Sequence, residues 1–80
     1  MAEYSVSDLK TLAASGDVER LADAYTSAKD ANAKMTAEIE LVKGIEYCIN
    51  HNEPGKLAVL LRRYNKLPAS ARGMAFEGAS

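Results

Sequence analysis

The chain has 80 residues, of which 48% are hydrophobic and 26% charged, an ordinary composition for one small globular domain. This length excludes two independent cores, because so short a chain has little interior to divide. Ten basic and eleven acidic residues nearly cancel, which excludes a histone-like DNA coat and a polyacidic tail. The single cysteine, Cys48, excludes an internal disulfide, and together with His51 it is too little for a structural zinc site.

The first elements in chain order are a short helix and a tight corner. Ser5 followed by Asp8 predicts a capping box, with Ser7 as an equally good N-cap. Apolar residues then recur at helical spacing. Gly16 favours a left-handed helix end, and Asp17 directly after it can cap the next helix.

Residues 18–50 predict one long central helix, because the segment has no proline and one glycine. Its positions at alternating steps of three and four form a mainly apolar seam: Val18, Leu21, Tyr25, Ala28, Asn32, Met35, Ile39, Val42, Glu46 and Ile49. Unbroken, this helix would be about 50 Å long. The alternative is a kink or break near residues 31–36, since Asn32 lies on the seam and Thr36 can serve as a fresh cap.

The C-terminal part predicts two further helices. Asn52 or Glu53 is the expected cap of a helix over 54–66, since proline is tolerated in a first turn, and Leu67-Pro68 ends it. Ser70 can cap a last short helix. No segment alternates like a strand between hairpin turns. We therefore expect an all-α fold in a single domain, 1–80: a small bundle with a long central helix, flanking short helices and frayed ends at 1–4 and 77–80.

Little in the sequence favours catalysis. It lacks glycine-rich phosphate loops, a nucleophile elbow and the H-E-x-x-H motif. Cys48 and His51 lie three residues apart, but a helix C-terminus disfavours a thiolate, so a structural thiol is the better interpretation than a nucleophilic pair or half a metal site. We predict no enzyme activity, no metal and no cofactor.

Charge is distributed unevenly and indicates a first candidate site. Residues 1–50 carry five bases and nine acids, a balance of −4, whereas residues 51–80 carry five bases and two acids, a balance of +3. The candidate partner-binding residues of this basic end are Arg62, Arg63, Tyr64, Lys66 and Arg72. Three interpretations stay open: docking on an acidic protein, contact with nucleic-acid phosphates, or neutralisation of the chain's own acidic helix. Sparse aromatic residues favour protein over nucleic acid.

The apolar seam is a second candidate site. The remaining helices contain enough chain to cover about one stripe of the long helix, which leaves apolar surface open, and such surface indicates an interface. Asn32 is the kind of polar seam residue that fixes the register of associating helices. We therefore expect a homodimer or an obligate partner at Tyr25, Asn32, Met35, Ile39 and Val42. Glu46, also on the seam, is expected to pair with Arg62 or Arg63, or to face a partner.

Residues 57–76 read LAVLLRRYNKLPASARGMAF, a basic leucine-rich helix followed by Leu-Pro-x-Ser-x-Arg at 67–72 and a short helix. This region resembles the C-terminal part of small uncharacterised helical accessory proteins of tailed bacteriophages. The resemblance implies a phage protein, made in the host bacterial cytoplasm, that binds and blocks a host enzyme or defence complex.

The N-terminus lacks a basic and apolar leader, and no stretch approaches the roughly 18 apolar residues of a membrane span, so a soluble cytoplasmic protein without membrane contact is expected. The leading hypothesis is a non-catalytic protein-binding module. The alternatives are a small nucleic-acid-binding protein that uses the basic face, and a structural or assembly protein.

Overall fold

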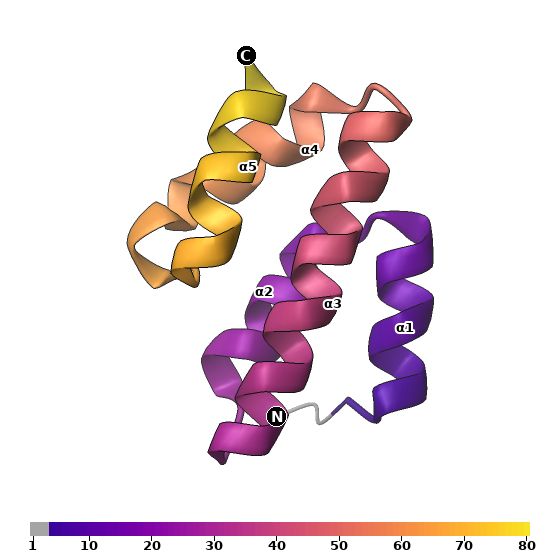
Figure 1. Ribbon diagram of the computed structural model, residues 1–80, viewed down its shortest axis with the longest axis vertical. Helices are drawn as coiled ribbons and strands as arrows, with labels where there is room; N and C mark the ends of the chain where they lie inside the picture. Colours follow the sequence, from indigo (N-terminus) through magenta and orange to yellow (C-terminus); the bar gives the residue numbers. More distant parts are fainter. Residues whose placement is uncertain (1–3) are drawn as a thin grey trace.

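The computed structural model describes residues 4–80. These residues form an all-α fold, shown in Figure 1: α1 (Val6–Ser15), α2 (Val18–Ser27), α3 (Ala31–Asn50), α4 (Pro54–Leu60), the 3₁₀ helix η1 (Leu61–Lys66) and α5 (Ala69–Ala79). The predicted fold class, a long helix flanked by shorter ones, is confirmed. The fraying expected at 1–4 lies outside the described residues except for Tyr4, which packs against the core.

The α1–α2 corner forms as its local sequence predicts. The Ser5 hydroxyl accepts a hydrogen bond from the Asp8 backbone N–H at 3.0 Å, and the Asp8 carboxylate accepts one from the Ser5 N–H at 3.2 Å. Gly16 ends α1 with a φ of +72°, and a Cβ added there would lie 2.6 Å from a ring carbon of Tyr47. Glycine is therefore required at this corner for its conformation and for the close approach of α3.

The prediction of one helix over residues 18–50 is wrong. Helix α2 ends at Ser27 and α3 begins at Ala31, so the chain breaks just before the 31–36 window of the alternative prediction. A continuous helix of about 50 Å would exceed the longest dimension of the molecule, which measures 33 × 24 × 19 Å. The bend lets α2 return along α3 and bury apolar side chains between them.

Local contacts stabilise this break. Asp30, rather than Thr36, is the N-cap of α3, and its carboxylate accepts a hydrogen bond from the Ala33 N–H at 2.8 Å. The Lys34 ammonium lies 4.4 Å from the centre of the Tyr25 ring and donates to the Tyr25 carbonyl at 3.5 Å. The seam residue Tyr25 therefore closes the bend from α2 instead of extending the outer face of α3.

The predicted helix over 54–66 changes type part-way. Its α-helical hydrogen bonding stops at Leu60, and a 3₁₀ turn with a kink at Arg63 follows. Pro68, not Ser70, occupies the cap position of α5. The Ser70 hydroxyl donates instead to the Glu38 carboxylate at 2.6 Å. This bond joins the start of α5 to α3.

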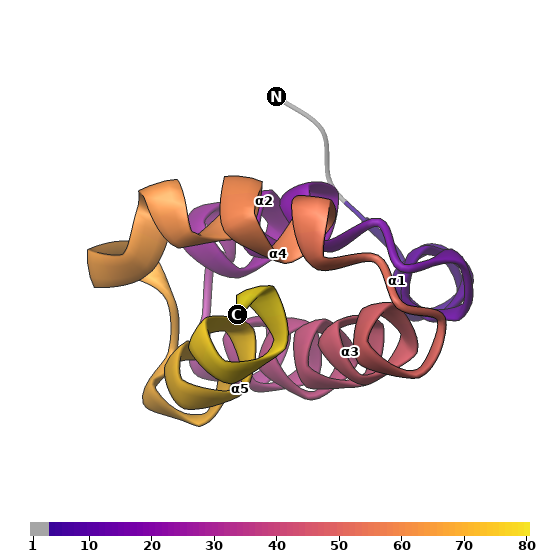
Figure 2. The ribbon, with the colours of Figure 1, turned by 90° about the horizontal axis from the view of Figure 1, so that it is seen from above.

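The helices form two layers with α1 at one side. Figure 2 shows α3 and α5 side by side in one layer, with α2 and α4 in the other. The largest side chains buried between them are Val18, Leu21, Leu41, Ile45, Cys48, Leu57 and Leu60. Gly44 lets α2 approach α3, because a Cβ there would lie 2.7 Å from a methyl carbon of Leu21. Within residues 4–80, none of the helices combines the length and hydropathy of a bilayer-crossing segment.

Candidate functional site

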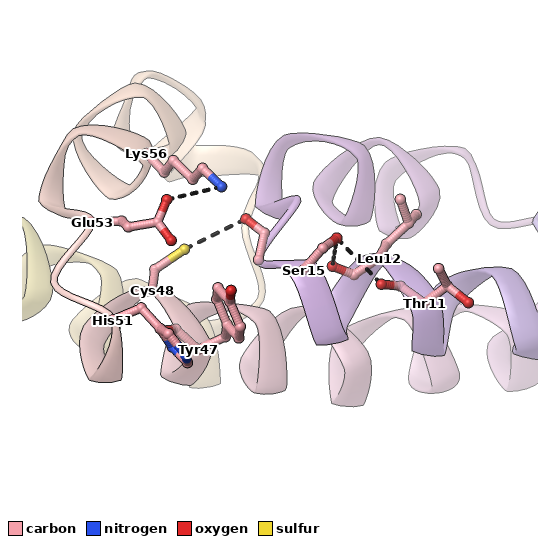
Figure 3. A network of polar contacts seen from close by, with 9 residues as sticks. Thr11, Leu12, Ser15, Tyr47, Cys48, His51, Glu53 and Lys56 are labelled. Carbon is pink, nitrogen blue, oxygen red and sulfur yellow. Dashed lines mark hydrogen bonds and ion pairs between the residues drawn. The ribbon is translucent and has the colours of Figure 1, made fainter.

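Cys48 and His51 do not form a joint site (Figure 3). The Cys48 thiol is fully buried and donates to the Gly16 carbonyl at 3.5 Å. The exposed His51 ring stacks on Tyr47 with centroids 3.8 Å apart. Burial raises the pKa of Cys48, and a neutral buried thiol is a poor nucleophile. In the part of the chain that the structure describes, no three His, Cys, Asp or Glu side chains are grouped so that they could hold a metal ion.

The predicted basic residues gather around η1. Arg62, Arg63, Tyr64 and Lys66 line one cleft of about 750 Å³, between η1 and the C-terminal half of α2. Arg72 lies on α5, with its guanidinium carbon 5.5 Å from the centre of the Tyr64 ring. The structure therefore brings all five candidates into one neighbourhood.

Arg63 is engaged within the molecule. Its guanidinium donates to the Asp23 carboxylate and lies 3.5 Å from that of Glu19, both on α2. The hydrogen bond with Asp23 and the charge of both acids raise the pKa of Arg63. Of the two expectations for Glu46, the ion pair with Arg62 or Arg63 does not form. Glu46 is exposed on α3, and its place at a partner surface stays a prediction. The break after α2 explains why that ion pair does not form, because it brings the acids of α2 beside η1.

Arg72 is also turned inward. Its Nε donates to the Leu67 carbonyl at 3.0 Å, and an Nη donates to the Asn65 carbonyl at 3.4 Å. These bonds tie α5 to the end of η1 and place the guanidinium over Tyr64, whose side chain stays 44% exposed. The Arg72 guanidinium thus covers part of the Tyr64 ring.

Arg62 and Lys66 are the two candidate cations on η1 that are exposed. The same cleft is lined by Asp23, so its surface mixes positive and negative charge. Charge along the sequence groups the candidate residues together and does not separate the two exposed cations from the two held within the molecule. For Arg63 this separation depends on Asp23, which lies 40 positions earlier in the chain.

The seam residues of α3 form a second, separate surface. Met35 is 61% exposed and Ile39 49%, with Asn32 exposed and Val42 half-buried. Ile49 belongs to the predicted seam but not to the predicted interface residues, and it is 43% exposed on the same helix. The three-four spacing already contained the signal for Ile49.

The chain matches no protein-family model, no curated protein and no solved structure. The likeness of residues 67–72 to phage accessory proteins stays a prediction. Interpretation of both surfaces therefore rests on their chemistry.

Proposed function

We propose that the protein is a non-catalytic binding module that docks on an acidic surface of a larger protein, and that it works as a homodimer. The observation that carries the docking proposal is the arrangement of η1. Arg62 and Lys66 are exposed there, two positions before and two after the half-exposed Tyr64, whose ring lies against the Arg72 guanidinium. In the phage setting implied by the resemblance, the partner is a host enzyme or defence complex that the module blocks by covering its surface.

Contacts with neighbouring helices hold η1, which forms one side of the proposed docking cleft. A 3₁₀ helix has weaker hydrogen bonds than an α-helix. Arg63 ties η1 to Asp23 on α2, and Arg72 ties it to α5, so neighbouring elements hold it in place. A tyrosine beside arginine is typical of the few residues that dominate protein–protein affinity. Holding such side chains in advance lowers the entropy cost of binding.

The electrostatics favour a protein partner over a nucleic acid. Asp23 lines the cleft, and Glu19 lies beside it, so a phosphate chain following the surface would meet acids as well as bases. Arg62 and Lys66 would supply about two phosphate contacts, and each contributes only about −0.9 to the salt slope of binding. An acidic protein surface can instead match the mixed pattern residue by residue.

The test is quantitative affinity capture from bacterial lysate. Wild type is compared with Arg62→Glu/Lys66→Glu and with Lys10→Glu/Arg20→Glu, which makes the same charge change on α1 and α2. We expect wild type and the control to enrich the same acidic protein, with recovery at least about tenfold lower for the η1 variant. Equal recovery by all three contradicts the proposal. Binding of a labelled duplex or RNA at low salt that only the η1 variant loses would favour the nucleic-acid alternative.

A further inference from the structure

The outer face of α3 carries a heptad pattern. Six positions follow one another at steps of three, four, three, four and three: Asn32, Met35, Ile39, Val42, Glu46 and Ile49. They occupy the a and d positions of a coiled-coil heptad in alternation, beginning with Asn32 at a. The core uses the opposite side of the helix, where Leu41, Ile45 and Cys48 are buried. α3 therefore has two apolar faces, and the fold covers one of them.

This second face is open in the monomer. Met35, Ile39 and Ile49 account for three of the six large hydrophobic side chains that are most exposed among the described residues. Figure 2 shows that α3 and α5 form an outer layer, with α2 and α4 on its other side. The face extends along most of a helix of about 30 Å. Regularly spaced apolar residues exposed over this length indicate an interface.

The charged residues beside the outer face of α3 favour a second copy of the chain as the partner, with the two α3 helices parallel. In the same heptad, Glu38 takes a g position and Lys43 the following e position. In parallel coiled coils a g residue faces the e residue five positions later on the other helix. Two copies would therefore place each Glu38 beside the other copy's Lys43. An antiparallel pair that overlaps the two faces in full brings e positions together, and Lys43 would then meet the neutral Thr36 of the other copy.

Lys43 is exposed enough to reach such a partner, and one oxygen of the half-buried Glu38 carboxylate is already used within the chain. The Lys43 side chain is 57% exposed, and its ammonium is 3.6 Å from Glu40 of its own chain. Glu38 accepts from Ser70 through Oε2, so its Oε1 lies on the other side of the carboxylate. These contacts within the chain orient the Lys43 ammonium and the Glu38 carboxylate, and they leave Lys43 exposed to solvent.

We infer that two copies of this chain associate through the outer faces of α3, with the two helices parallel and symmetric Glu38–Lys43 ion pairs between them. This inference rests on the homodimer proposed above, but not on the acidic partner. A strip about 30 Å long and one helix wide is smaller than the about 800 Å² per copy of a standard stable interface. We therefore expect micromolar affinity. Glu46 of one copy would face Glu46 of the other, and the repulsion between these two carboxylates would weaken the dimer.

The first experiment measures mass by sedimentation velocity and light scattering from about 1 to about 500 µM, a range that brackets micromolar association. Wild type is expected to become a dimer, and Ile39→Glu to weaken dimerisation by at least about 30-fold. Val6→Glu is the matched control, because Val6 is equally exposed but lies on α1. Circular dichroism checks that each variant folds. A wild type that stays monomeric, or an Ile39→Glu variant that dimerises normally, overturns the inference.

The second experiment fixes the orientation. In a Glu40→Gln background, which removes the acid that Lys43 pairs with in its own chain, Lys43→Glu should weaken the dimer and Glu38→Lys/Lys43→Glu should restore it. Ser70→Ala controls for the lost hydrogen bond to Glu38. Oxidised Met35→Cys should cross-link to itself in a parallel pair, while the buried Cys48 contributes little background. A dimer that fails both tests overturns the parallel arrangement and leaves the proposed homodimer standing. Loss of capture by the η1 variant, with its dimer intact, reports separately on the acidic partner.

Discussion

Cys48 illustrates how burial controls the chemistry of a single residue. Its thiol lies between α3 and the α1–α2 corner, where it donates to the Gly16 carbonyl. Because burial raises its pKa in the folded state, the folded protein holds the thiol proton more tightly than the unfolded chain does. The resulting contribution to stability is complete below the ordinary thiol pKa and is lost as pH rises through the folded pKa.

This linkage predicts an alkaline loss of stability that depends on the thiol. Above about pH 8.5, the free energy of unfolding of wild type should fall with pH more steeply than that of Cys48→Ala. Urea titrations between neutral and alkaline pH measure both slopes. The alanine variant loses about 1 kcal/mol at every pH through its smaller side chain, which leaves the slope unaffected. Identical slopes, or rapid labelling of the folded wild type by a thiol reagent at neutral pH, would contradict the prediction.

At the scale of elements, glycine marks where α2 and α3 approach each other. Alanine favours a helix by about 1 kcal/mol over glycine. At Gly44, however, the added methyl group would lie 2.7 Å from Leu21 and 3.3 Å from Val18, both fully buried. Gly44→Ala is therefore expected to lower stability by about 1–2 kcal/mol through overpacking.

Gly73, on α5, is the matched control for this prediction, because a Cβ there meets nothing within 4 Å. Gly73→Ala should raise stability by about 0.5–1 kcal/mol through helix propensity alone. Thermal and chemical unfolding of the two variants should thus move in opposite directions. A stabilised Gly44→Ala protein would mean that the α2–α3 contact is looser than described.

Elements specified by neighbouring residues could be predicted from sequence, and elements specified by distant contacts could not. The capping box at Ser5 and the corner at Gly16 are local features, and both formed as expected. The break before Asp30 was misplaced because the apolar spacing continues across it without glycine or proline. Likewise, the basic residues could be found by composition. The inward turn of Arg63 depends on an acid on another helix.

At the scale of the whole molecule, α5 completes the single hydrophobic core. It packs on both α3 and α4, starting at the Ser70–Glu38 bond, and buries Ala71 and Ala75 completely. The Cα radius of gyration of 11.3 Å is close to the roughly 11.6 Å expected for a compact chain of this length. So small a domain has few alternative contacts to replace those of α5.

Two neighbouring positions on α5 test its importance. Ala75→Glu would bury a charge without a partner and is expected to lower stability by at least about 3 kcal/mol, a large share of the total for a small domain. Phe76→Glu makes a similar change at a side chain that is 64% exposed and should shift stability by about 0.5 kcal/mol or less. Unfolding in guanidinium compares them. Equal stability of the two variants would show that α5 contributes little to the fold.

The bend between α2 and α3 has a consequence for how copies of this chain can exchange segments. Positive φ angles occur at Gly16 and Asn52 among the described residues, so the bend itself requires no unusual backbone conformation. Its three residues, Ala28, Lys29 and Asp30, are also compatible with a straight helix. Straightening there would let α1 and α2 of one copy pack on α3 of another through the side chains that pack within one copy here. The bend is therefore a hinge of the type that permits domain swapping. Its position is set by the packing of α2 on α3 and by the Asp30 N-cap.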